Sequence, residues 1–147
     1  MNAGDLPLML ASGFTRVGPE PYPLDRVRMQ KAVFLITQRG TPRLRELYEY
    51  RPYNWGPYSD ALAQDVRALE ATGRMAVEAA PGSRYGRYVT TVVGEAHVIP
   101  VWNDLEPGER AFVANVRRYV TASSFNKLLR EVYAEYPEFA TASQFRG

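Results

Sequence analysis

The residues best suited to bind a partner are aromatic side chains crowded into one short segment: Tyr48, Tyr50, Tyr53, Trp55 and Tyr58. Arg51 and Asn54 stand among them. Aromatic and arginine side chains together form the hot spots of protein interfaces and the stacking platforms of nucleic-acid sites. Large aromatic residues are also usually buried, so Gly56 and Pro57 fit a turn whose rings pack into the core. We expect the core to hold most of the rings, with Arg51 and Tyr53 exposed.

An amphipathic segment follows this loop and predicts a helix over residues 59–72, with Ser59 as its N-cap. Its polar face carries Gln64 and Arg67, whose side chains suit the edges of adenine and guanine. Three acids in the same segment oppose contact with phosphates: Asp60, Asp65 and Glu70. A solvated helix face accounts for the pattern equally well, so DNA contact and solvent exposure both stay open.

The most basic stretch consists of two short runs, 75–80 and 87–93, around the turn sequence PGSRYG at 81–86. Such a pattern predicts a β-hairpin. Around it lie Arg74, Arg84, Tyr85 and Arg87, with Glu78 as the one acid. Arginine and tyrosine at a hairpin tip reach phosphates or the minor groove, although a solubilising turn has the same composition. Arg84, Tyr85 and Arg87 therefore join Arg51, Tyr53, Ser59, Gln64 and Arg67 as candidate DNA contacts.

Side chains for catalysis are scarce. The chain has no cysteine, and His97 is its single histidine, so neither thiolate chemistry nor a histidine metal cluster is available. The glycines of GSRYGR lack the spacing of a phosphate-binding loop. We therefore predict no catalytic residue, no metal site and no cofactor.

The elements that position these residues follow from apolar periodicity and helix stop signals. Helices are expected over 25–38, 59–72, 107–121 and 124–136. Residues 44–50 fit a short helix or a strand, and Thr91 fits the cap of a further helix that Pro100 interrupts. Residues 1–23 are expected to form an irregular arm, or a short helix followed by an extended segment.

This order of elements is that of a winged helix-turn-helix with additional C-terminal helices, a mainly α fold with a small β-hairpin (α+β). We expect one compact domain made of an arm (1–23), a winged-helix core (24–100) and a C-terminal helical extension (101–147). In this arrangement helix 59–72 enters the major groove and the hairpin is the wing.

Four segments in order resemble a family pattern: RVRMQKAVFLI, YEYRPYNWGPYSDALAQDVRALEATGRM, YVTTVVGEA and VYAEYPEFATAS. Together, over residues 26–142, they are similar to the SocA-like/Panacea antitoxin group and its winged-helix relatives. The segment 88–94 also resembles the wing-to-helix junction of MarR- and PadR-type regulators, although Thr90 stands where leucine is usual. The resemblance implies a winged-helix-like fold, a role as antitoxin, regulator or adaptor, and no enzyme activity.

Two hypotheses on function remain. The leading one is a non-catalytic transcriptional regulator that binds double-stranded DNA, expected to be a homodimer joined by its C-terminal helices. The alternative is an antitoxin- or adaptor-type module that binds a toxin-like protein through Tyr53, Trp55 and Tyr58. The net charge of only +2 favours the alternative. No segment reads as a membrane span or export signal, so we expect a cytoplasmic protein.

Overall fold

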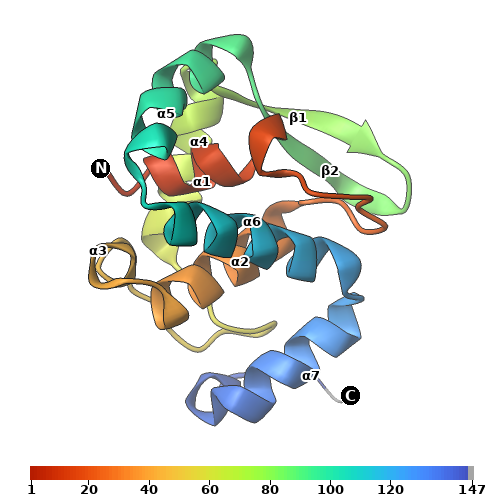
Figure 1. Cartoon of the computed structure of the whole chain (residues 1–147). Helices are drawn as coiled ribbons and strands as arrows, with labels where there is room; N and C mark the ends of the chain where they lie inside the picture. Colours follow the sequence, from red (N-terminus) through yellow and green to blue (C-terminus); the bar gives the residue numbers. More distant parts are fainter. Residues whose placement is uncertain (146–147) are drawn as a thin grey trace.

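The computed structural model describes residues 1–145 and has a mainly helical fold with one antiparallel hairpin, an α+β arrangement (Figure 1). The α-helices described there are α1 (Asp5–Leu10), α2 (Arg26–Arg39), α3 (Pro42–Arg45), α4 (Asp60–Ala71), α5 (Val92–Asp104), α6 (Pro107–Ala122) and α7 (Phe125–Glu135). The strands are β1 (Met75–Ala80) and β2 (Ser83–Thr90), and the 3-10 turns are η1 (Gly13–Thr15) and η2 (Pro137–Ala140). Among these helices, none is both long and apolar enough to cross a bilayer.

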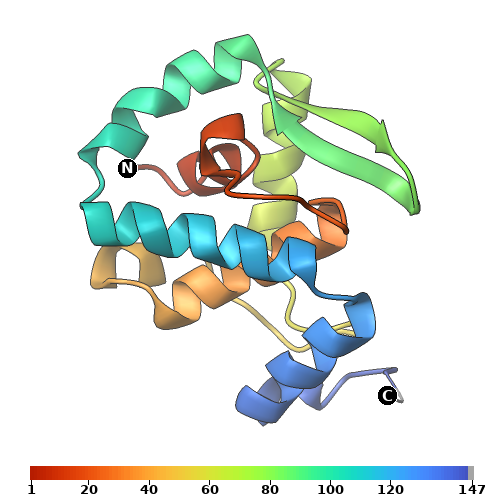
Figure 2. The ribbon, with the colours of Figure 1, turned by 45° about the vertical axis from the view of Figure 1, so that its right-hand side comes forward.

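Helix α1 lies at the centre of the fold, where α2, α4, α5 and α6 surround it (Figure 2). All six of its residues are buried, and Leu6, Leu8, Met9 and Leu10 have no exposed surface. Residues 1–23 therefore do not form an irregular arm. They form the alternative that the sequence allowed, a short helix followed by an extended segment. Burial on every side explains why α1 has no polar face for a periodicity argument to detect.

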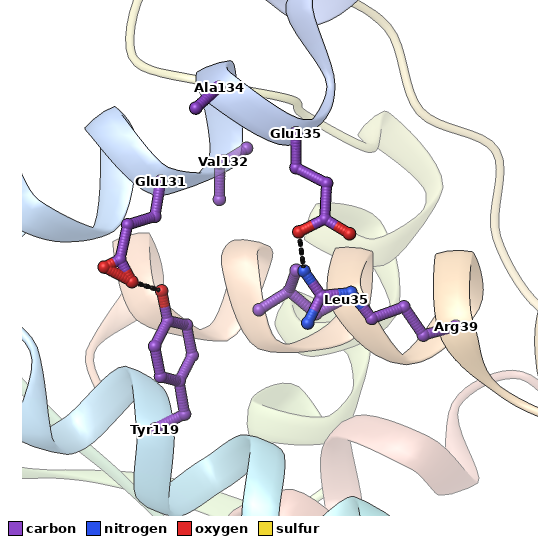
Figure 3. A pocket seen from close by; sticks show the side chains of 7 residues that line it. All are labelled: Leu35, Arg39, Tyr119, Glu131, Val132, Ala134 and Glu135. Carbon is purple, nitrogen blue, oxygen red and sulfur yellow. Dashed lines mark hydrogen bonds and ion pairs between the residues drawn. The ribbon is translucent and has the colours of Figure 1, made fainter.

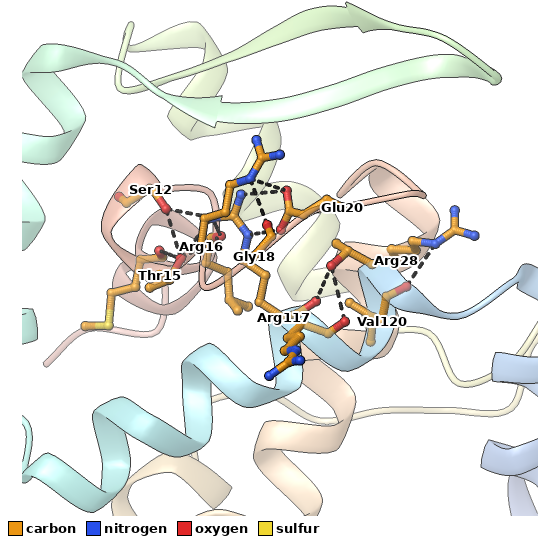
Figure 4. Close-up of polar contacts among 12 residues, drawn as sticks. Ser12, Thr15, Arg16, Gly18, Glu20, Arg28, Arg117 and Val120 are labelled. Carbon is orange, nitrogen blue, oxygen red and sulfur yellow. Dashed lines mark hydrogen bonds and ion pairs between the residues drawn. The ribbon is translucent and has the colours of Figure 1, made fainter.

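A buried arginine fastens this N-terminal segment to α6 (Figure 4). Arg117 donates from Nε and Nη2 to the carboxylate of Glu20 at 2.7 and 3.1 Å. Its Nη1 donates to the carbonyl oxygens of Leu10 and Ser12 at 2.8 and 2.6 Å. Because Arg117 is only 5% exposed, these bonds satisfy a charge that water cannot reach.

Helix α2 packs against α1, α3, α6 and strand β2. The side chain of Asp25 accepts from the Arg28 amide at 2.9 Å and caps the helix, as expected. The side-chain amide of Gln30 then bonds both backbone groups of Ser59, donating to its carbonyl at 3.0 Å and accepting from its N–H at 2.9 Å. These two hydrogen bonds fix the start of α4 against the middle of α2.

The first strand of the hairpin matches the predicted run 75–80, but the second strand begins and ends earlier in the sequence than predicted. Strand β2 starts at Ser83, so the turn consists of Pro81 and Gly82 alone, and the predicted turn 81–86 is wrong beyond Gly82. Gly82 adopts a left-handed φ of +79°, which places the reversal there. Gly86 also adopts a positive φ, and a Cβ on it would lie 2.4 Å from the Glu78 carbonyl oxygen. The glycine therefore marks the irregular register between the strands at Glu78 and Ala80, not the turn.

Helix α5 begins at the predicted cap, where the Thr91 hydroxyl accepts from the Gly94 amide at 3.1 Å. The prediction that Pro100 interrupts it is wrong, because the helix runs on to Asp104. Proline removes the bond to the carbonyl of Ala96, and both residues lie on the exposed face, where water can bind that carbonyl. Helices α6 and α7 match their predicted ranges to within one residue at each end.

Candidate nucleic-acid and ligand surface

The structure brings half of the predicted residues together around one hollow, which we call the α4 groove, and leaves Arg51, Ser59, Gln64, Arg84 and Arg87 outside its lining. It has a volume of about 610 Å³ and lies between α2, the aromatic loop, α4 and the hairpin. Predicted candidates on its lining are Tyr53, Trp55, Tyr58, Arg67 and Tyr85. The other lining residues are Arg26, Val27, Met29, Gln30, Lys31, Leu62, Ala63, Val66, Glu70, Val77 and Tyr88.

The aromatic loop is closed by a short antiparallel bridge. The N–H of Arg51 donates to the Tyr58 carbonyl at 3.0 Å, and the Tyr58 N–H donates back at 2.9 Å. Across this closed loop the rings of Tyr53 and Tyr58 lie 4.9 Å apart. Tyr53 and Trp55 are 39% and 44% exposed, whereas Tyr48 is buried. Exposure of Tyr53 was predicted and that of Trp55 was not.

Arg51 is exposed as predicted, but its charge already has a partner. Its guanidinium bonds the carboxylate of Asp60 and lies 4.8 Å from the centre of the Tyr53 ring. The hydrogen bonds from Arg51 hold the pKa of Asp60 below its ordinary value. Arg51 therefore links the aromatic loop to the first turn of α4.

Helix α4 presents Gln64 and Arg67 to solvent, as the sequence predicted. Within residues 1–145, neither side chain has a hydrogen bond or ion pair in the structure, so both are free to contact a partner. The prediction that Ser59 contacts DNA does not fit its position, because it is 1% exposed. Its hydroxyl instead accepts from the Leu62 amide at 3.2 Å and caps the helix.

The hairpin carries Arg84 and Tyr85 near its tip, both exposed. The guanidinium of Arg26, from the start of α2, stacks on the Tyr85 ring at 3.7 Å and bonds its hydroxyl, which lowers the pKa of that tyrosine. Arg87 is half-buried, and its Nε has no hydrogen-bond partner in the described part of the chain. Within residues 1–145, Arg84 and Arg87 therefore make no ion pair with an acid, and the hairpin tip that carries Arg84 packs on the start of α2.

Lys31 is the residue of this surface that sequence reasoning missed. It lines the α4 groove, yet only 4% of its surface is exposed. Burial lowers the pKa of its ammonium group to about 7, against the opposing charge of Asp25. The available signal was its place inside the apolar run KAVFLI, since a lysine there must point inward or interrupt the core face.

Gly56 makes room for this lysine. With a φ of +105°, it takes a conformation that other residues rarely adopt. A Cβ on Gly56 would lie 2.7 Å from Cε and 3.0 Å from Nζ of Lys31, and 2.9 Å from Cδ2 of Leu129. The glycine that the sequence offered as a turn residue therefore also lets the loop pass directly over the Lys31 side chain.

A second hollow, of about 500 Å³, lies between α2, α6 and α7 (Figure 3). Its polar side chains are already paired with one another. Arg39 bonds Glu135, and the Tyr119 hydroxyl donates to Glu131. Burial, together with this hydrogen bond, raises the pKa of Tyr119, and the same bond lowers the pKa of Glu131. This hollow offers a ligand fewer free polar groups than the α4 groove does.

Comparison with known proteins adds no family to this description. No protein-family model matches the chain, and no curated protein matches its sequence significantly. Residues 1–145 also contain no group of three or more side chains arranged to hold a metal ion.

Proposed function

We propose that the protein is a non-catalytic winged-helix transcriptional regulator that binds double-stranded DNA. In this proposal α4 enters the major groove, Gln64 and Arg67 contact base edges, and the hairpin follows the adjacent backbone. Arg84 and Arg87 contact phosphates, with Tyr85 beside them.

The observation that carries the proposal is the tight joint between α4 and the hairpin. Gly73, at a left-handed φ of +74°, turns the chain, and the Arg74 N–H donates to the Leu69 carbonyl at 3.0 Å. Thr91 closes the same joint from the other strand, because its hydroxyl donates to the Gly73 carbonyl at 2.7 Å. These bonds fix the base of the hairpin to the end of α4, which supports a fixed orientation of the hairpin cations relative to the helix.

The acids of α4, which argued against DNA from sequence alone, are mostly occupied. Asp60 pairs with Arg51, and Asp65 accepts from the Tyr48 hydroxyl at 2.5 Å. Glu70 remains without an ion pair within residues 1–145. The neutral tyrosine leaves the charge of Asp65 in place, so two uncompensated carboxylates remain on this helix where the sequence suggests three, and the repulsion of phosphates is weaker.

A homodimer completes the proposal, because winged-helix regulators place two helices in successive major grooves. Helix α5 supports this with exposed apolar side chains: Val92 is 88% and Val93 64% exposed. Exposed apolar surface of this kind favours a protein contact. We therefore place the contact on α5, which immediately precedes the C-terminal extension that the sequence favoured. We expect light scattering to give the mass of a dimer for the wild type and that of a monomer for Val92→Glu.

A second function, binding of a toxin-like protein, is favoured by one observation. Tyr53 and Trp55 expose two large rings at the edge of a groove, the kind of anchor that protein interfaces use. If this function holds, substitution of Tyr53 and Trp55 by alanine abolishes capture of the protein encoded beside this gene and leaves DNA binding unchanged.

The test of the leading proposal is fluorescence anisotropy with labelled duplexes, titrated at several salt concentrations. One duplex is the region upstream of the gene, and the other has the same base composition in scrambled order. We expect tighter binding to the upstream region and a linear fall of log affinity with log salt. Absence of binding to either duplex at low salt contradicts the proposal.

A further inference from the structure

Lys31 is a buried cation without a partner. Within residues 1–145 it makes no ion pair and no hydrogen bond, although it is 4% exposed. Removing an ammonium group from water is costly, and the negative charge of Asp25 offsets only part of that cost, so a lysine in such a place is suited to a function as well as to packing. Since Lys31 also lines the α4 groove, the compensation can come from a molecule that enters the groove.

The remaining charges of the groove point to the sign of that molecule. Arg26 and Arg67 add two cations to Lys31, while Glu70 is the single acid on the lining. Arg26 is engaged with Tyr85, but that stack leaves its charge in place. Three cations against one acid favour an anion.

The walls of the groove indicate what kind of anion. Aromatic rings from the loop and hairpin line it: Tyr53, Trp55, Tyr58, Tyr85 and Tyr88. Apolar side chains of α2 and α4 line it as well: Val27, Met29, Leu62 and Val66. Such walls suit a flat, apolar body, and a volume of about 610 Å³ is within the range of small-molecule sites.

We propose that the α4 groove binds a small organic anion, whose carboxylate or phosphate head pairs with Lys31 while its flat apolar body lies against Tyr53 and Trp55. The pairing replaces the water that burial took from the ammonium group, and it favours the protonated lysine. Binding therefore weakens as pH rises above about 7, where Lys31 of the empty groove loses its proton. The proposal does not depend on DNA binding, because its test contains no DNA.

The test uses three rigid probes that share one body: 1-naphthoate, 1-naphthyl phosphate and neutral 1-naphthamide. Their affinities are measured by calorimetry at pH 6.5 with the wild type, Lys31→Met and Lys127→Met. The chain has only these two lysines, and Lys127 is exposed on α7, so it is the matched control. We expect at least one anion to bind about tenfold or more tightly than the amide. Whichever of the two anions binds more tightly identifies the head group.

Lys31→Met should remove the preference for the anion, and Lys127→Met should keep it. Equal affinity for anion and amide, an unchanged preference in Lys31→Met, or no binding of either anion overturns the proposal.

A second measurement uses the wild type alone, so its result does not depend on whether the Lys31→Met variant folds. In protein carrying ¹³C-lysine, NMR resolves two side chains, and the anion should raise the pKa of Lys31 but not that of Lys127. An unchanged Lys31 titration at saturating anion overturns the proposal as well.

Discussion

The guanidinium of Arg51 holds the carboxylate of Asp60 by two hydrogen bonds, Nε to Oδ2 at 2.8 Å and Nη2 to Oδ1 at 3.1 Å. The pair joins the aromatic loop to the first turn of α4. Both side chains are exposed, so the pair adds little to stability. Its consequence is electrostatic, because it neutralises an acid at the end of the helix proposed to face DNA.

This pair predicts a specific pattern in a double-mutant cycle. Arg51→Ala should weaken duplex binding several-fold, although Arg51 does not contact DNA in the proposal, because it uncovers the charge of Asp60. Asp60→Asn alone should bind at least as tightly as the wild type, and the double variant should match Asp60→Asn. Anisotropy at one low salt concentration measures all four proteins. If the double variant binds as weakly as Arg51→Ala, then Arg51 itself contacts DNA.

Ser59→Ala should lower the free energy of unfolding by about 1 kcal/mol through loss of the helix cap, measured by urea denaturation. Well below the melting temperature, its duplex affinity should stay that of the wild type, since Ser59 is buried. Ser124→Ala is the matched control, because the Ser124 hydroxyl caps α7 by accepting from the Lys127 amide at 3.2 Å. A loss of affinity in Ser59→Ala but not in Ser124→Ala would return Ser59 to the DNA surface.

Arg117→Met should destabilise the fold by about 3–5 kcal/mol, because it strands the buried carboxylate of Glu20 and frees backbone carbonyls of the N-terminal segment. Urea denaturation measures the loss, and proteolysis should become faster within residues 11–24. Arg118→Met, on the exposed side of the same helix, should change stability little. Similar losses of unfolding free energy in the two variants would mean that the buried hydrogen-bond network of Arg117 does not stabilise the fold.

Lys31 predicts how stability depends on pH. Its folded pKa of about 7 lies below that of an unfolded lysine, about 10.4, so between these values the unfolded state binds the additional proton. The free energy of unfolding should therefore rise as pH increases from 7 to 9, by up to about 1.4 kcal/mol per pH unit. Urea denaturation of the wild type and of Lys31→Met follows it, and the rise should be missing from the variant. Parallel curves for the two proteins would contradict the buried position of the lysine.

Sequence patterns predicted the elements that have two distinct faces. Helix α4 has Leu62, Val66 and Leu69 on its buried side and a capping serine, and its predicted range is correct to within one residue at each end. The same signals failed for α1, which is buried all round, and for β2, where two glycines made strand residues look like a turn. The prediction at Pro100 was wrong because a proline removes only one backbone hydrogen bond of a helix. The helix can continue when the carbonyl that loses its partner faces water.

For the candidate surface, the sequence predicted correctly those residues whose role depends only on being exposed. Gln64, Arg67, Arg84 and Tyr85 lie at the surface, as expected from the polar face and the hairpin. The pairing of Arg51 and the burial of Lys31 depend on contacts between distant segments. Lys31, for example, lies next to Gly56 only after the loop has folded over α2. Such contacts leave no spacing in the sequence that a pattern could detect.

The most direct test of the central claim compares two pairs of charge reversals in duplex binding. Arg67→Glu with Arg84→Glu changes α4 and the hairpin, whereas Arg118→Glu with Arg130→Glu changes exposed arginines of α6 and α7 by the same net charge. We predict that the first pair abolishes binding at low salt, and that the second pair retains it with a nearly unchanged salt dependence. Equal losses from the two pairs, or a greater loss from the second, would contradict a DNA surface built from α4 and the hairpin.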